Sequence, residues 1–119
     1  MADSNEILQQ LIDDVRDVRS VFIASNDGFL IDGVTTNNNI DLEDLAASVI
    51  PKIDEMADLS EDFAFGPWEI SMVEFENGTL LVSWLEDDAI LVVSARGRRN
   101  IGTLRMKIKK LADDLRQTL

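Results

Sequence analysis

The chain has 119 residues, 45% apolar and 29% charged, which is typical of one globular domain and argues against a disordered tail. It contains no cysteine and no histidine, which excludes disulfides, thiolate metal sites, cysteine nucleophiles and a Ser-His-Asp triad. The net charge of −12 disfavours binding of nucleic acid or anionic membranes by the surface as a whole. No apolar run is long enough to span a membrane, and the acidic N-terminus is not a signal peptide. A cytoplasmic protein is therefore expected.

The charge is unevenly placed along the chain. Residues 1–95 carry 21 acidic and 3 basic side chains, whereas residues 96–119 carry 8 basic and 2 acidic ones. The C-terminal segment is thus the basic part of an acidic protein.

The first third of the chain predicts a helix followed by a β-hairpin. Apolar residues recur at helical spacing over 4–16, and Asp3 or Ser4 can cap this helix. Residues 20–25 are β-branched and aromatic, and the apolar run resumes after Asn26-Asp27-Gly28. An Asp-Gly pair between two such runs favours a tight hairpin, because glycine adopts a positive φ without steric cost.

A second amphipathic helix is expected over residues 41–58, with Asp41 as its N-cap. Its apolar stripe is about 140° wide, broader than the ~100° that a core helix normally buries. Pro51 falls in the middle of this helix, on the side opposite the stripe. Because proline has no N–H and crowds the carbonyl of Ala47, a kink or a break is expected there.

The second half of the chain predicts three strands, at 68–76, 79–85 and 89–95, and a last helix over 101–118. Asn77-Gly78 joins the first two strands as a tight hairpin. The last two strands are near-continuous apolar runs, which is typical of strands covered on both faces. The element order αββαβββα therefore predicts a single α+β domain over residues 1–119, with helices on both faces of one antiparallel sheet.

No residues form a persuasive catalytic site. Adjacent carboxylates occur in pairs such as Asp13 and Asp14, but neighbours on a helix or turn point apart and stay solvated. Acid–base catalysis needs a carboxylate in a dry pocket, so we expect no enzymatic activity, no cofactor and no metal site.

The basic run from Arg96 to Gly102 admits three interpretations. A glycine-containing basic loop before a helix can hold an anion through free N–H groups, although the phosphate-loop spacing is absent. Contact with a protein partner is the second. The third is charge balance, in which the basic flank formed by Arg105, Lys109 and Arg116 lies beside Asp13, Asp14 and Asp17 of the first helix.

The width of the second helix's stripe suggests apolar surface that one chain does not cover. An apolar edge strand carrying Trp68, Ile70 and Met72 adds to it, since such edges associate unless they are paired. We predict a homodimer that pairs these edges and packs the second helices together; the alternative is a wide but ordinary core helix.

The order and spacing of the motifs resemble the roadblock / dynein light chain family over about residues 5–116. Residues 18–30 are similar to the family's first hairpin with its Asp-Gly turn, and Leu42 to Met56 to its second helix. Ile90 to Val93, followed by Asn100 to Arg105, are similar to the last strand and the start of the last helix.

The resemblance implies a five-stranded antiparallel sheet, with the second helix on one face and the first and last helices on the other. It implies a non-enzymatic protein that dimerises through the third strand and the second helix. Prokaryotic members of the MglB type bind small Ras-like GTPases and promote GTP hydrolysis, which makes such a GTPase the expected partner. Carried over, the dimer interface comprises Val49, Ile50, Ile53, Met56, Trp68, Ile70 and Met72.

We expect the paired second helices to offer Asp44, Asp54, Glu55 and Asp58 to a basic surface of the GTPase. An arginine donated to the reaction by Arg96, Arg98 or Arg99 is a further possibility. The competing hypothesis is a passive scaffold that binds its partner without changing GTP turnover. Neither hypothesis involves nucleic acid or insertion into a membrane.

Overall fold

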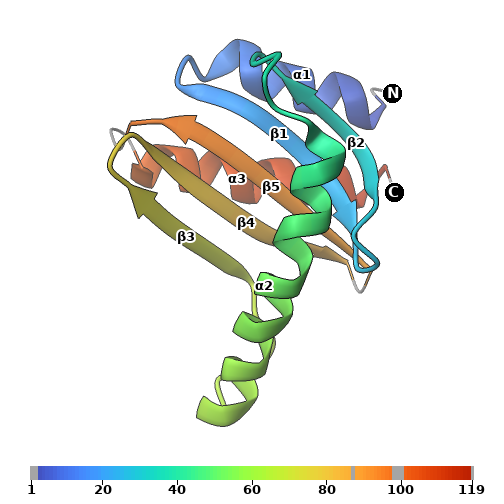
Figure 1. Cartoon of the computed structure of the whole chain (residues 1–119), viewed down its shortest axis with the longest axis vertical. Helices are drawn as coiled ribbons and strands as arrows, with labels where there is room; N and C mark the ends of the chain where they lie inside the picture. The colour runs from blue at the N-terminus through green and yellow to red at the C-terminus, as the bar shows by residue number, and fades with distance from the viewer. Residues whose placement is uncertain (1–2, 87, 98–100, 119) are drawn as a thin grey trace.

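The computed structural model describes residues 3–86, 88–97 and 101–118. Figure 1 shows a sheet crossed in front by one long helix and backed by two others. The elements in chain order are α1 (Ser4–Asp14), β1 (Val18–Ser25), β2 (Leu30–Thr35), α2 (Leu42–Phe63), β3 (Ile70–Phe75), β4 (Gly78–Glu86), β5 (Ala89–Arg96) and α3 (Ile101–Arg116). This is the predicted αββαβββα order.

The five strands form one antiparallel sheet in the order β2-β1-β5-β4-β3. β1 and β5 are neighbours at its centre, although about 70 residues separate Val21 from its partner Val93 in the chain. β2 and β3 are the two edges, each paired with one neighbour only. The predicted α+β fold is confirmed.

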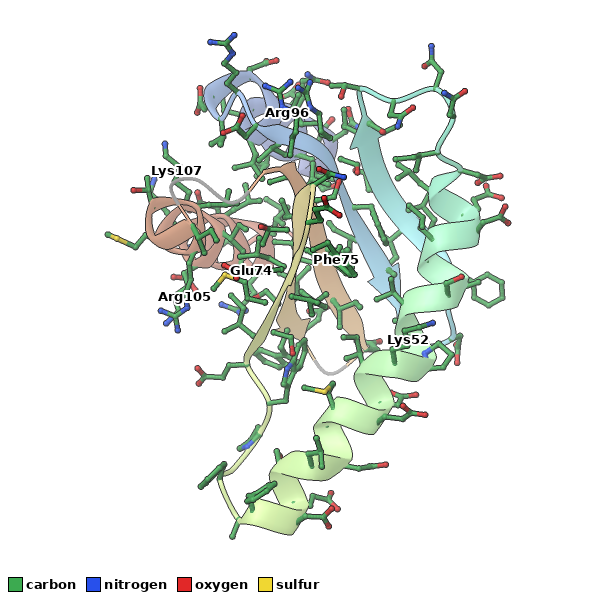
Figure 2. All side chains as sticks on the ribbon, turned by 60° about the vertical axis from the view of Figure 1, so that its left-hand side comes forward. Lys52, Glu74, Phe75, Arg96, Arg105 and Lys107 are labelled. Carbon is green, nitrogen blue, oxygen red and sulfur yellow. The ribbon has the colours of Figure 1, made fainter. Side chains whose placement is uncertain are left out.

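Two apolar cores lie on opposite faces of the sheet, as the continuous apolar strands predicted. Figure 2 shows the sheet between α3 on one side and α2 on the other. The first core joins Leu8 and Leu11 of α1 to Leu104, Ile108 and Leu115 of α3. In the second, residues Ala46 and Ile50 of α2 pack on Phe22, Val82 and Val92. Alternate residues of β5 serve the two cores in turn, so the central strands are buried on both sides.

The helix starts follow from their caps. The carboxylate of Asp3 accepts a hydrogen bond from the N–H of Glu6 at 2.9 Å, and that of Asp41 accepts from Glu43 at 2.9 Å and Asp44 at 3.4 Å. Each carboxylate satisfies amides that have no partner within the helix and suits the positive end of the helix dipole. The predicted start of α1 is confirmed; the helix ends at Asp14, two residues earlier than expected.

α2 differs from its prediction in two respects. It runs without a break from Leu42 through Pro51 to Phe63, so the predicted break and the predicted end at residue 58 are wrong. The exposed ring of Pro51 faces solvent, where the lost hydrogen bond leaves the carbonyl of Ala47 accessible to water. Ala64 caps the end of the helix: its left-handed conformation (φ 57°) lets its N–H donate to the carbonyl of Glu61 and the N–H of Phe65 donate to that of Ser60.

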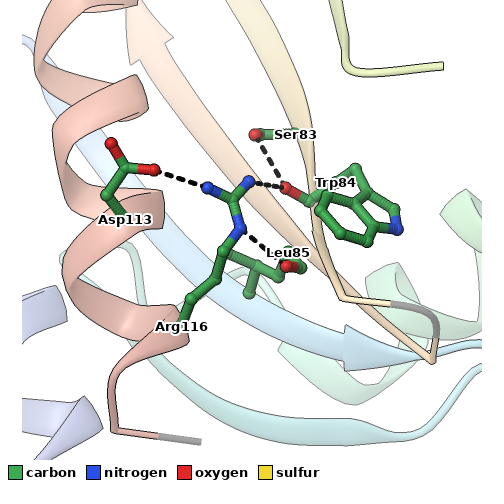
Figure 3. A network of polar contacts seen from close by, with 5 residues as sticks. All are labelled: Ser83, Trp84, Leu85, Asp113 and Arg116. Carbon is green, nitrogen blue, oxygen red and sulfur yellow. Dashed lines mark hydrogen bonds and ion pairs between the residues drawn. The ribbon is translucent and has the colours of Figure 1, made fainter. Parts of the chain in front are cut away.

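Arg116 ties the end of α3 to the end of β4 (Figure 3). Its Nε donates to the carbonyl of Leu85 and its Nη2 to that of Trp84, both at 2.7 Å. Its Nη1 pairs with the Asp113 carboxylate at 2.6 Å, and the guanidinium lies 5.1 Å from the centre of the Trp84 ring. All three nitrogens of this cation are therefore directed at the chain itself.

Candidate interaction surface

The second half of α2 has no sheet beneath it. The helix packs on β1 and β2 near its start and then projects past the end of the sheet (Figure 1). Met56 and Phe63 lie on this projecting part and are 44% and 62% exposed, and Leu59 between them is also exposed. Apolar side chains at this spacing normally face a core. Here they form a stripe that the chain leaves open to solvent.

β3 is an open edge strand, paired with β4 alone. In its antiparallel register Ser71 pairs with Val82 and Val73 with Leu80, which places Ser71, Val73 and Phe75 on the face that α2 covers. Val73 is 45% exposed and Phe75 58%. The edge thus presents unpaired backbone groups together with exposed apolar side chains, a combination that associates unless it is covered.

The predicted interface residues divide into three groups. Ile50 is only 6% exposed and belongs to the core beneath α2, so its own chain covers it. Val49, Ile53 and Trp68 are half-buried at the margin of that core, and Met56 is exposed. Ile70 and Met72 pair with Ser83 and Leu81, which places them on the α3 face of the sheet, away from α2.

Several exposed apolar residues were missed by the sequence reasoning. Leu59 and Phe63 extend the stripe of α2 at intervals of three and four residues, a signal hidden by ending the helix at residue 58. Phe65, beyond the helix, stacks on Phe63 with ring centres 5.5 Å apart. Val73 and Phe75 alternate with Met72 along β3, so the period of two indicated that only one of these sets could share a face with α2.

An open, mostly apolar hollow separates the projecting end of α2 from the sheet. Its volume is about 800 Å³, and its lining includes Ala57, Pro67, Trp68 and Trp84. The indole Nε1 of Trp68 donates to the hydroxyl of Ser71 at 2.9 Å, which fixes this ring beside the start of β3. Trp68 thus connects the hollow to the start of β3, and we call the stripe of α2, the hollow and the α2 face of β3 together the apolar flank.

The predicted partner-binding carboxylates lie on a different side of α2. Asp44, Asp54, Glu55 and Asp58 are all exposed. At ~100° per residue, the centre of this group lies roughly 120° around the helix from the centre of the stripe formed by Met56, Leu59 and Phe63. We call this side the acidic flank. The two flanks face different directions, so a partner on one does not fill the other.

The basic run is only partly described. The N–H of Arg96 donates to the carbonyl of Asp17 at 2.7 Å, and its guanidinium lies 3.8 Å from the Asp17 carboxylate. Arg98, Arg99 and Asn100 lie outside the described residues. Asp14 shares a hollow of about 390 Å³ with Lys107 and Lys110, but among the described residues no ion pair joins α1 to α3. The three interpretations of this run therefore stay open.

Asp32 on the edge strand β2 holds the first turn of α1. Partial burial acts to raise the pKa of its carboxyl, but hydrogen bonds from the side chains of Asn5 and Ser4 and from the N–H of Gly33 outweigh burial. The pKa of Asp32 is consequently lowered from its ordinary value.

The described residues offer neither a metal site nor a membrane span. Within that part of the chain, no group of three or more carboxylates is arranged to hold a metal ion. No helix among the same residues is long and apolar enough to cross a membrane.

The fold is that of an α+β domain with a five-stranded antiparallel sheet, one helix on one face and two on the other. The family model for the Roadblock/LC7 domain matches residues 4–95, so the chain belongs to this family. The family expected from the sequence motifs is thereby confirmed. None of the curated proteins compared with the chain matches it.

Solved structures resemble the chain closely in fold. Myxococcus xanthus MglB matches with a TM-score of 0.88 and 24% identity, over 96% of this chain and 85% of that one. The gliding protein MglB from Thermus thermophilus matches with a TM-score of 0.87 and 16% identity, over 97% and 87% of the two chains. A Roadblock/LC7 domain from Streptomyces avermitilis matches with a TM-score of 0.86 and 19% identity, over 98% and 97%.

Proposed function

We propose that this chain is a non-enzymatic homodimer that binds a small Ras-like GTPase and promotes its GTP hydrolysis. The observation that carries the proposal is the apolar flank, because a single copy leaves it open while burying the strongly apolar residues at the sheet's centre. Membership of the Roadblock/LC7 family and the likeness in fold to MglB support the same assignment.

The dimer follows from the position of the open edge. Two β3 strands pair antiparallel about a two-fold axis perpendicular to the sheet, which makes one continuous sheet and keeps both α2 helices on one side. The projecting half of each α2 then lies over the partner's edge. There Met56, Leu59 and Phe63 cover the apolar side chains of β3, while the acidic flank remains exposed.

The GTPase contact uses the acidic flank. α2 carries seven carboxylates and one lysine, Lys52, so two paired copies present a strongly negative surface. Such a surface speeds encounter with a basic patch and selects against acidic partners. Hydrolysis is then promoted by holding the GTPase's own switch residues in place, since positioning dominates phosphoryl transfer.

The passive scaffold is the second candidate, and the position of Arg96 favours it over a donated arginine. This cation, at the end of β5, already lies 3.8 Å from the Asp17 carboxylate. A scaffold binds the GTPase as tightly but leaves its turnover unchanged.

The dimer is tested by mass in solution. Ile53→Asp and, separately, Met56→Asp place a charge in the apolar flank, and each is expected to convert a dimer to monomers because an unpaired charge is costly in an apolar interface. Met56 is exposed in the single chain, so its variant keeps the fold even where Ile53→Asp does not. The proposal is contradicted if the wild-type protein has the mass of a monomer, or if Met56→Asp leaves the mass of the dimer unchanged.

The regulatory activity is tested by GTP turnover of a Ras-like GTPase with and without the protein. Asp54→Lys/Glu55→Lys/Asp58→Lys is expected to lower the affinity for the GTPase by tenfold or more, at about 1.4 kcal/mol per factor of ten. The matched control reverses charges on the opposite face, at Glu6 and Asp13 of α1. Binding without acceleration would assign the scaffold; absence of binding would reject both candidates.

A further inference from the structure

The middle of α3, from Arg105 to Lys110, carries four cations that make no hydrogen bond or ion pair with the residues that the structure describes. Arg105, Lys107, Lys109 and Lys110 are exposed, and Met106 among them is 73% exposed. Figure 2 shows Arg105 and Lys107 extending from α3, with Lys52 on α2 far from both. We call this set of five residues the α3 ridge. No carboxylate interrupts it before Asp113.

The ridge cations have no partners in the described part of the chain. No hydrogen bond or ion pair joins Arg105, Lys107, Lys109 or Lys110 to another described residue. Arg116 on the same helix differs, since its donors are directed at Leu85, Trp84 and Asp113. Arg116 at the end of α3 therefore stabilises the fold, whereas the described structure assigns no such contact to the cations between Arg105 and Lys110.

The ridge lies on the opposite side of the sheet from the acidic flank. The molecule is 26 Å thick along its shortest axis, the direction in which α2, the sheet and α3 are stacked (Figure 1). Fields in physiological salt decay over about 8 Å. A ligand on the ridge is therefore screened from the carboxylates of α2, in spite of the net charge of −12.

From this arrangement we infer a second docking surface: the α3 ridge binds an acidic peptide segment of a partner protein. The ridge is one helix wide and is bounded by Asp14 of α1 on the side of Lys107 and Lys110, and by Glu69 on the side of Lys109. A flat anionic membrane or a long nucleic acid would press against these carboxylates and those of α1. A narrow peptide runs along the ridge between them, with carboxylates on the cations and an apolar side chain on Met106.

This surface is independent of the proposed dimer and of the GTPase contact, which use α2 and β3. In a dimer built on β3 both ridges lie on the same side of the continuous sheet, so a partner with two acidic segments gains by avidity. The protein then joins a GTPase on one face to a second protein on the other.

The test uses a fluorescein-labelled peptide with the repeat Glu-Leu-Glu-Glu, followed by anisotropy at low and at physiological salt. Wild type is expected to bind it, more weakly as salt rises, and not to bind the matched Gln-Leu-Gln-Gln peptide. Arg105→Gln/Lys109→Gln and Lys107→Gln/Lys110→Gln each lower the affinity about fivefold or more, since charge-assisted contacts are lost. Lys52→Gln, which removes the lysine of α2, changes nothing.

Three results overturn the inference: no binding of the acidic peptide at low salt, equal loss with Lys52→Gln, or binding that the two ridge variants leave unchanged. Vesicles of phosphatidylcholine with phosphatidylserine are the second probe. Binding of these vesicles with the same dependence on the ridge, and tighter than the peptide, would assign a membrane instead and also overturn it. Dimer mass and GTPase binding of the ridge variants stay at wild-type values, which separates this surface from the proposed function.

Discussion

The two halves of α2 share one amphipathic spacing but have opposite surroundings. Ala46 and Ile50 are buried on β1, β4 and β5, whereas Met56 and Phe63 face solvent beyond the sheet. The first half therefore stabilises the single chain, and the second half contributes little until a partner covers it. The apolar spacing of a helix therefore does not distinguish residues that pack on their own chain from residues that pack on another molecule.

The largest expected difference between the two halves is in stability. In the Met56→Asp background, Ile50→Ala is expected to lower the free energy of unfolding by about 2–5 kcal/mol, since it leaves a cavity in the core. Phe63→Ala in the same background changes it by less than about 0.5 kcal/mol, because an exposed side chain loses few contacts. Chemical denaturation measures both. Equal losses would mean that the second half of α2 is packed on its own chain.

A smaller effect is expected on the affinity of the dimer, when substitutions on the two faces of the edge strand β3 are compared. Phe75→Glu is expected to weaken the dimer by about tenfold or more, because Phe75 shares a face with α2. Met72→Glu lies on the α3 face, where the stripe of α2 does not reach, and is expected to weaken it less. Sedimentation over a concentration series gives both dissociation constants. A larger effect of Met72→Glu would show that the partners meet on the α3 face.

The smallest expected effect is on stability, at the other edge strand, β2, against which the start of α1 is held. Asp32→Asn is expected to cost under about 1 kcal/mol near neutral pH, through weakened hydrogen bonds to Ser4 and Asn5. The pKa of Asp32 is lowered in the fold, so its contribution is complete above the unfolded value of about 3.9 and is lost as the pH falls through the folded value. Denaturation curves of wild type and variant should start to converge as the pH falls below about 3.9, and should meet only below the lowered pKa of the folded state. A gap that persists there would show that charge on Asp32 is irrelevant.

Much of the fold could be predicted because its signals are local. Asn77-Gly78 indicates a hairpin, although the turn itself is made by Glu76 and Asn77, and Gly78 begins β4 without a positive φ. Asp41 indicates a helix start, and the apolar runs of β4 and β5 indicate cover on both faces. The end of α2 could not be predicted in this way. A proline in mid-helix normally argues for a break, but here the buried stripe on the other side holds the helix together across Pro51.

The candidate interface was harder to predict than the fold. The family resemblance assigns Ile50 and Met72 to the interface, but Ile50 is buried in its own chain, and strand alternation places Met72 on the opposite face from Val73. Which apolar residues a chain covers itself depends on the register of β3 and on where α2 leaves the sheet. Neither of these is encoded in the neighbouring sequence alone, since both depend on pairing with distant strands.

The pairing of β1 with β5 also sets when the protein can fold during synthesis. Ser20 on β1 hydrogen-bonds Ser94 on β5, so the middle of the sheet joins residues separated by most of the chain. A nascent chain that has reached only α2 holds β1 and β2 as a lone hairpin, which is marginally stable in water. The sheet can therefore close only after β5 emerges from the ribosome, and until then the apolar side chains of β1 lack the strand that covers them.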